Sequence, residues 1–296
     1  MDFYRNWFLA SRPWSLTMTA VSIATGFIYA ATPGDINWFW FLLTLLAGTF
    51  VHLASNLLND YFDVKNGIDT AFVSTARYRP HPLVEGNVTP QKVFWASIAL
   101  YSLAAVIGIA LVLLRGVVLL WIGLAGMLLA MTYTAPPLRY KYKGLGELGV
   151  LIIWGPLMIG GSFFIQTASL NESVIILSVP LGLLVALVLY INNVRDIIND
   201  RDKKISTLAI FLTSDFAIHF YTFLIILAFV WVIVISIFGP LTLFSLLVLL
   251  SLPLAINLIK KMYRQVPDNA DAETARLVTL FGVLLLISML MSHYYG

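Results

Sequence analysis

Two short stretches gather oxygen-bearing side chains in a chain that otherwise has few charged residues. The first, NLLNDYFDVKNGID, covers residues 56–69 and begins where a long apolar segment ends. If a helix continues through it, Asn56, Asp60 and Asp63 share one face, and Asn59 and Asp63 form a second pair four residues apart. Carboxylate and amide oxygens suit Mg²⁺, which binds proteins together with water and substrate phosphates. The alternative for this stretch alone is a solvated helix end.

The second stretch, NNVRDIINDRDKKISTLA, covers residues 192–209 and also follows an apolar segment. Asn192, Asp196 and Asp200 are spaced by four residues, and Arg195 lies among them. Two helix ends of this kind on one side of the molecule favour an anion that is held through bridging metal ions. A diphosphate fits, because carboxylates hold Mg²⁺, Mg²⁺ holds phosphoryl oxygens, and Lys and Arg neutralise the remaining charge.

The elements that carry these stretches are predicted to be membrane helices. The chain is 60% hydrophobic and 11% charged, against about 25% charged in typical soluble domains, and its mean hydropathy is +0.89. Apolar windows of roughly 20 residues, the length that crosses a bilayer, recur nine times. They cover about 14–31, 38–58, 92–114, 117–134, 146–167, 173–194, 214–238, 240–259 and 275–292. We therefore expect an all-α polytopic membrane protein with nine transmembrane helices and a single domain over residues 1–296.

The basic residues predict the orientation of the chain. Of 18 Lys and Arg residues, all but Arg115 fall at the N-terminus or in loops on one side of the nine predicted spans. The positive-inside rule then places the N-terminus and both polar stretches on the cytoplasmic side of the cell (inner or plasma) membrane. The same asymmetry explains the net charge of +3, so no nucleic acid partner is expected. The chain has no cysteine, which excludes disulfides and thiol chemistry.

Both polar stretches resemble the two aspartate-rich motifs of the UbiA superfamily of intramembrane prenyltransferases. Three further segments are similar to family motifs: ASRPWSLTMTAVSIATG (10–26), RPHPLVEGNVTP (79–90) and YTAPPLRYKYKGLGELGVLIIWGPL (133–157). The last looks like the branch that prenylates 1,4-dihydroxy-2-naphthoate in menaquinone biosynthesis. The resemblance spans nearly the whole chain and implies nine helices around a central cavity.

The resemblance implies Mg²⁺-dependent transfer of an isoprenyl group from a polyprenyl diphosphate to a small aromatic acceptor, with 1,4-dihydroxy-2-naphthoate expected. The catalytic residues would be Asn59, Asp63, Asp196 and Asp200. The candidate metal ligands are Asn59, Asp60, Asp63, Asp69, Asp196 and Asp200. The sequence leaves open whether Asp60 or Asp69 joins Asp63 as a ligand.

Basic and amide side chains near the motifs are the candidate partners of the diphosphate. They are Arg195, Lys141, Lys143, Arg139, Asn56 and Asn192, with Arg77 and Arg79 as further candidates. Aromatic rings attract positive charge, so Tyr133, Tyr140 and Trp154 are candidates to shield an allylic cation from water. Membrane lipid is the expected surrounding. His52, one turn before the first motif, is interpreted as a packed or hydrogen-bonded residue.

Several alternatives remain open from the sequence. Within the superfamily, the acceptor could be 4-hydroxybenzoate, homogentisate or geranylgeranylglyceryl phosphate, and a haem-tailoring enzyme or a terpene cyclase has the same motifs. A cation-coupled transporter would bind its ion near the midplane on interrupted helices, whereas these aspartates cluster at one face. An alcohol phosphotransferase would carry Gly directly after its second motif aspartate, where this chain has Val64.

Overall fold

The computed structural model describes residues 2–31, 36–70, 81–212 and 214–295, and every named element within these ranges is a helix. The elements in chain order are α1 (Asp2–Ala10), η1 (Pro13–Ser15), α2 (Leu16–Ala30), α3 (Trp38–Lys65), α5 (Pro90–Arg115), α6 (Val118–Thr132), η2 (Tyr140–Tyr142), α7 (Gly146–Ile152), η3 (Ile153–Leu157), α8 (Met158–Thr167), α9 (Glu172–Arg195), α10 (Ile197–Asp202), α11 (Leu208–Phe211), α12 (Ser214–Ile237), η4 (Leu243–Ser251), α13 (Leu252–Arg264) and α14 (Ala270–Tyr295). The expected all-α class is therefore what the described residues show.

Seven helical segments in the described ranges are long and apolar enough to cross a membrane. They are Trp38–Lys65, Pro90–Arg115, Gly146–Thr167, Glu172–Arg195, Phe216–Ile237, Leu243–Arg264 and Ala270–Tyr295. The other two predicted spans correspond to α2 and α6, each 15 residues long, which is shorter than the roughly 20 residues of a typical crossing. The count of nine crossings therefore stays a prediction.

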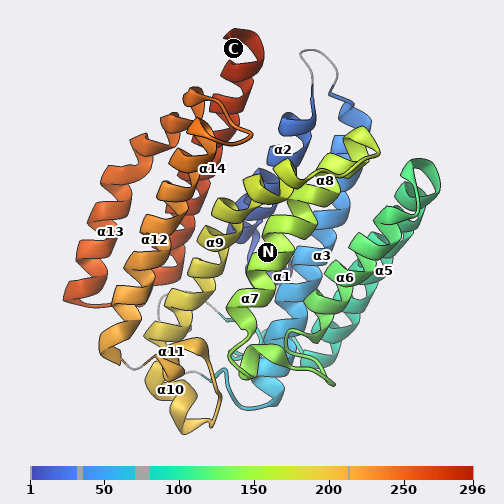
Figure 1. Ribbon diagram of the computed structural model, residues 1–296. Coiled ribbons are helices and arrows are strands. Elements are labelled where there is room, and N and C mark those ends of the chain that lie inside the picture. The colour runs from blue at the N-terminus through green and yellow to red at the C-terminus, as the bar shows by residue number, and fades with distance from the viewer. Residues whose placement is uncertain (1, 32–35, 71–80, 213, 296) are drawn as a thin grey trace.

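The long helices lie side by side in one bundle, with the short helices α10 and α11 together at its lower end in Figure 1. The largest core cluster includes Leu181 and Leu184 of α9, Tyr221 of α12 and Phe281 of α14, all fully buried. On the outside, Leu113 is 80% and Phe238 is 84% exposed. Apolar side chains on the outer surface are what a lipid surrounding requires, since water would disfavour them.

One of the membrane-length segments is irregular in its middle. Between α7 and α8, η3 is a π-helix that contains Pro156, whose ring prevents a regular helix from continuing. Close packing here depends on Gly182 of α9, because a Cβ at this position would lie 2.8 Å from the Leu151 carbonyl oxygen and 3.1 Å from the Cα of Gly155. The irregular turn carries Trp154, which lines the internal cavity described below.

Candidate active site

The first polar stretch folds back on itself where α3 ends. Gly67 adopts a positive φ of 69°, a conformation that glycine reaches without steric cost. The backbone N–H groups of Ile68 and Asp69 then both donate to the carbonyl of Asp63, at 2.8 and 3.2 Å. This turn returns the Asp69 side chain to the end of the helix that carries Asp60 and Asp63. The five residues between Asp63 and Asp69 therefore form a tight turn that brings the two carboxylates to the same helix end.

Asp63 lies at the centre of a set of hydrogen bonds from another part of the chain. Lys141 Nζ donates to Asp63 Oδ2 at 2.6 Å, and the Tyr142 hydroxyl donates to Oδ1 at 2.6 Å. On the same helix, Asn59 Nδ2 donates to Asp63 Oδ2 at 2.9 Å, while Asn59 Oδ1 accepts from Lys141 at 3.0 Å. Asp63 is only 2% exposed. A buried carboxylate requires such partners, because it loses its hydration.

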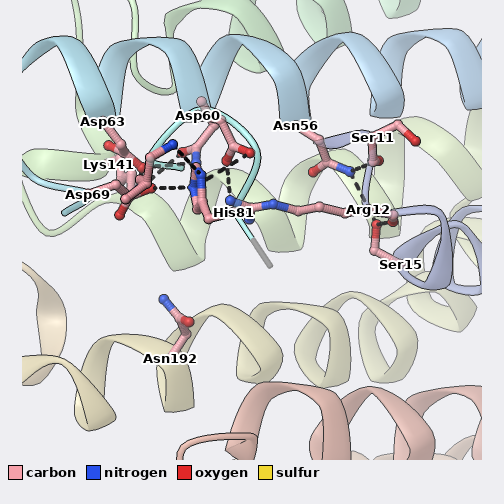
Figure 2. A network of polar contacts seen from close by, with 12 residues as sticks. Ser11, Arg12, Ser15, Asn56, Asp60, Asp63, Asp69, His81, Lys141 and Asn192 are labelled. Carbon is pink, nitrogen blue, oxygen red and sulfur yellow. Dashed lines mark hydrogen bonds and ion pairs between the residues drawn. The ribbon is translucent and has the colours of Figure 1, made fainter. Parts of the chain in front are cut away.

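Asp60 and Asp69 have different partners, as Figure 2 shows. Asp60 forms an ion pair with Arg12, which precedes η1. His81 Nε2 lies 3.2 Å from Asp69 Oδ2 and 3.9 Å from Asp60 Oδ2. His81 Nδ1 accepts from the backbone N–H of Val84 at 3.4 Å, so Nε2 carries the proton that it donates to Asp69.

The second polar stretch continues α9 almost without interruption into α10. The Asp196 N–H donates to the Asn192 carbonyl at 3.1 Å, and the Asp200 N–H donates to the Asp196 carbonyl at 2.9 Å. Arg195 donates to both oxygens of Asp196, at 3.1 and 2.7 Å. Among the residues that the structure describes, none donates a hydrogen bond to the Asp200 carboxylate. Asp200 therefore has free ligand capacity at this helix end.

The two stretches meet around a small polar pocket of about 60 Å³. Its lining is Arg12, Asn59, Asp63, Ile68, Asp69, Lys141, Asn192, Asn193, Asp196, Asn199, Asp200, Ile205 and Thr207. Four carboxylates and several amide oxygens thus face one space, and the Thr207 hydroxyl has no hydrogen-bond partner in the described part of the chain. This donor set fits Mg²⁺, which prefers oxygen ligands.

A larger, mainly apolar cavity of about 210 Å³ adjoins the polar pocket. Its walls come from several helices, with Met18 of α2, Val51 of α3, Ile153 of η3 and Val188 of α9 among them. The three aromatic residues expected near the reacting carbon, Tyr133, Tyr140 and Trp154, all line it. Four residues line both spaces: Arg12, Asn59, Lys141 and Asn192. The polar and apolar spaces are therefore in contact across these four side chains.

Burial and neighbouring charges shift the pKa values of Lys141 and Asp200 in the polar pocket. Burial alone disfavours the charged form of Lys141, but the nearby carboxylates, Asp63 foremost, raise the pKa of Lys141 above its ordinary value. Lys141 is therefore an ammonium ion at neutral pH. For Asp200, burial raises the pKa to about 7, with Lys141 opposing the shift. A cation that binds beside Asp200 would favour its ionised form.

The candidate diphosphate partners fall into two groups by position. Lys141 and Asn192 line the polar pocket, and Asn56 lines the apolar cavity. Arg139 and Lys143 are exposed and line neither space, while Arg195 is engaged by Asp196 and Asp271. Arg77 and Arg79 lie outside the described residues.

Sequence reasoning missed several residues at these helix ends. His81, Tyr142 and Thr207 contact or line the polar pocket but lie in segments without a periodic pattern. Asn193 also lines it, and its Nδ2 donates to the buried Glu147 at 2.9 Å. The doublet Asn192–Asn193 was the available signal for this last residue.

Comparisons with known proteins agree with this geometry. Residues 19–292 match the model of the UbiA prenyltransferase family. The chain is 31% identical to 1,4-dihydroxy-2-naphthoate octaprenyltransferase from Bacillus subtilis (strain 168), over 96% of this chain and 92% of the relative. It is 30% identical to human (Homo sapiens) UbiA prenyltransferase domain-containing protein 1, over 97% of this chain and 84% of that protein.

Solved structures with the same fold include a UbiA homologue from Archaeoglobus fulgidus bound to GPP and Mg²⁺. It superposes with a TM-score of 0.65 at 16% identity and covers 95% of this chain and 99% of its own. A UbiA homologue from Aeropyrum pernix K1 superposes with a TM-score of 0.67, also at 16% identity, covering 92% of this chain and 98% of its own. The family match over most of the chain, together with the two aspartate-bearing helix ends, establishes that this protein is an integral membrane prenyltransferase of the UbiA family.

Proposed function

We propose that the protein transfers an isoprenyl group from a polyprenyl diphosphate to an aromatic quinone precursor, 1,4-dihydroxy-2-naphthoate, with Mg²⁺ as cofactor. The resemblance to the Bacillus subtilis octaprenyltransferase over nearly the whole chain supports this acceptor. The binding of GPP and Mg²⁺ by a UbiA homologue of the same fold supports the donor and the metal.

The observation that carries the proposal is the contact between two unlike spaces. A diphosphate head group needs the carboxylates and Lys141 of the polar pocket, whereas an isoprenyl chain and an aromatic ring need the apolar cavity. The four shared residues mark where the allylic carbon would lie, between its leaving group and its acceptor.

Asp63, Asp196 and Asp200 would hold Mg²⁺, with Asn59 and Asp69 as further oxygen ligands in the same lining. When bound, Mg²⁺ supplies positive charge that stabilises the departing diphosphate. Lys141 adds a fixed ammonium at the junction of the two spaces, where it stabilises the same developing negative charge.

The transfer breaks the allylic C–O bond, whose electron pair leaves with the diphosphate. A ring carbon of the acceptor then supplies the pair for the new C–C bond. A proton or carbon dioxide leaves the ring as aromaticity returns. Tyr133 and Tyr140 lie with ring centroids 5.4 Å apart in the cavity wall, and Lys141 Nζ lies 5.7 Å from the Tyr133 ring. Their faces would exclude water from the allylic cation.

The proposed setting is the cell membrane, with nine crossings, a cytoplasmic N-terminus and both aspartate-bearing helix ends at the cytoplasmic face. The positive-inside distribution supports this orientation. The short helices α2 and α6 supply the two crossings beyond the seven long segments.

The function is tested with purified full-length protein, Mg²⁺ and geranylgeranyl diphosphate, offered separately with four acceptors. These are 1,4-dihydroxy-2-naphthoate, 4-hydroxybenzoate, homogentisate and geranylgeranylglyceryl phosphate. We expect prenylated product with dihydroxynaphthoate. Product with the glycerol phosphate alone would overturn the proposed acceptor.

A further inference from the structure

A hydrogen-bonded row of polar side chains crosses part of the wall of the larger, mainly apolar cavity. It consists of Ser15, Thr19, His52 and Asn56, which come from η1, α2 and α3. All except Thr19 line the cavity. Thr19 is fully buried and His52 is 5% exposed, so the row is part of the packed interior.

The donors and acceptors in this row can be assigned. The Ser15 hydroxyl donates to the Arg12 carbonyl at 2.8 Å, so its oxygen can only accept from its other neighbours. Those neighbours are His52 Nε2 at 3.1 Å and Asn56 Nδ2 at 3.2 Å. His52 therefore carries its proton on Nε2, and its Nδ1 accepts from the Thr19 hydroxyl at 2.7 Å.

The assignment fixes the orientation of the Asn56 amide. Its second N–H donates to the Ser11 carbonyl at 3.1 Å, so both amide hydrogens are used. Figure 2 shows the nitrogen directed at Ser11 and Ser15 and the oxygen pointing away from them. No group in the described part of the chain donates to Asn56 Oδ1. Asn56 thus presents an acceptor, and no donor, to a ligand in the cavity that it lines.

Trp154 supplies the complementary group on the neighbouring wall. Its ring meets His52 edge to face, with centroids 5.0 Å apart and an interplanar angle of 81°. Its indole N–H is buried and has no acceptor among the described residues. A mainly apolar cavity that presents an acceptor and, on the neighbouring wall, a donor is suited to a ligand with both kinds of polar group.

We propose that this wall is the acceptor site, and that it selects a phenolic ring: one hydroxyl donates to Asn56 Oδ1, and another ring oxygen accepts from Trp154 Nε1 after a small shift of the indole. The inference rests on the proposed function and names the groups that recognise the acceptor. Ser15, Thr19 and His52 are positioning residues, because their hydrogen bonds hold the amide of Asn56 in this orientation.

This geometry also serves the reaction. A phenol that donates a hydrogen bond to a carbonyl oxygen gains electron density on its own oxygen and on the ring carbons beside it. One of those carbons supplies the electron pair that forms the new C–C bond, while the C–O bond to diphosphate breaks. The oxygen of Asn56 favours a phenol over a phosphate, because a phenol donates a hydrogen bond to it, whereas a phosphate dianion offers only acceptors.

The test compares Asn56→Leu with the native enzyme by steady-state kinetics, using 1,4-dihydroxy-2-naphthoate and its two mono-O-methyl ethers. We expect the variant to raise the acceptor KM at least about tenfold, which corresponds to one lost hydrogen bond to a buried group, while the KM for the diphosphate stays within twofold. The native enzyme should lose a similar factor with one methyl ether, and the variant should not discriminate against that ether.

Two further variants keep the test independent of folding. Trp154→Phe keeps an aromatic ring against His52 but removes the indole N–H, and Thr19→Val replaces the hydroxyl that holds His52 by a methyl group; both should raise the acceptor KM and leave the diphosphate KM unchanged. Ser55→Ala is the matched control, because its hydroxyl lies in the same cavity lining but is already bonded to Val51 and Tyr101.

The outcomes separate this inference from the proposed function. Aromatic product with an unchanged acceptor KM in Asn56→Leu and Trp154→Phe would overturn the inference alone. A rise in the diphosphate KM of Asn56→Leu would also overturn it, by assigning Asn56 to the diphosphate. A native enzyme that prenylates geranylgeranylglyceryl phosphate and no phenol would overturn both.

Discussion

Lys141 Nζ lies 2.6 Å from Asp63 Oδ2, so this buried aspartate of α3 is paired with a cation from a segment 78 residues away. The ion pair offsets part of the cost of burying Asp63, and it places an ammonium at the border of the two spaces. Loss of either partner leaves a buried charge without compensation.

Replacement of Lys141 by Gln should lower kcat/KM for the diphosphate by about 30-fold or more, in the range of a lost charged hydrogen bond. Lys143→Gln is the matched control, because Lys143 is two residues away but exposed and outside both linings. Steady-state kinetics with varied diphosphate measures both. Equal losses in the two variants would contradict the role given to Lys141.

Metal removal should stop the transfer completely. We expect EDTA to abolish turnover and added Mg²⁺ to restore it. The two cations that line the polar pocket, Arg12 and Lys141, are too few to neutralise its four carboxylates and the negative charge of a diphosphate. Asp63→Ala and Asp196→Ala should be inactive at any Mg²⁺ concentration. Calorimetric titration of Mg²⁺ with an unreactive diphosphate analogue gives a readout separate from turnover. Full activity in EDTA would refute the metal mechanism.

Substitution of Asp69 should change the Mg²⁺ requirement, whereas substitution of Asp60 should change thermal stability. Asp69 lines the polar pocket, so Asp69→Asn should raise the Mg²⁺ concentration needed for half-maximal activity several-fold. Asp60 lies outside that lining and pairs with Arg12, so Asp60→Asn should mainly lower Tm by several degrees. Metal titration and thermal unfolding of both variants check this. The reverse pattern would make Asp60 the metal ligand.

The proposed orientation can be tested by labelling, because the native chain has no cysteine. Lys203→Cys and Tyr295→Cys place single thiols at exposed positions after α10 and at the end of α14. A membrane-impermeant maleimide added to intact cells should label Tyr295→Cys and not Lys203→Cys. Labelling of both from the same side would contradict the odd number of crossings.

The sequence predicted the helical class and the candidate residues of the two polar stretches, because apolar length and i, i+4 spacing are local properties. Asn59 and Asp63 are in contact as their spacing on one helix requires. The partners that complete the site come from elsewhere. Lys141 was a candidate only by resemblance, and the contact of His81 with Asp69 depends on the turn at Gly67, which periodicity does not reveal.

The number of crossings shows a different limit. A hydropathy window averages the apolar character of its residues and contains no information on where a helix begins or ends. Residues 14–31 were one predicted span, but Pro13 starts the short helix η1, and α2 begins only at Leu16. The window 146–167 is one membrane-length segment in the structure, as predicted, but hydropathy does not reveal the π-helix at Pro156 within it. Trp154 reaches the cavity through that irregularity, which tertiary packing determines.

The pairing of Asp60 with Arg12 and of Asp63 with Lys141 has a consequence for how the protein is made. Both aspartates lie near the end of α3. Arg12, the partner of Asp60, precedes them in the chain, whereas Lys141, the partner of Asp63, is synthesised 78 residues after Asp63. A nascent chain that contains only the first three helices thus holds Asp63 without its cation. The site can therefore assemble only after the later helices have been inserted.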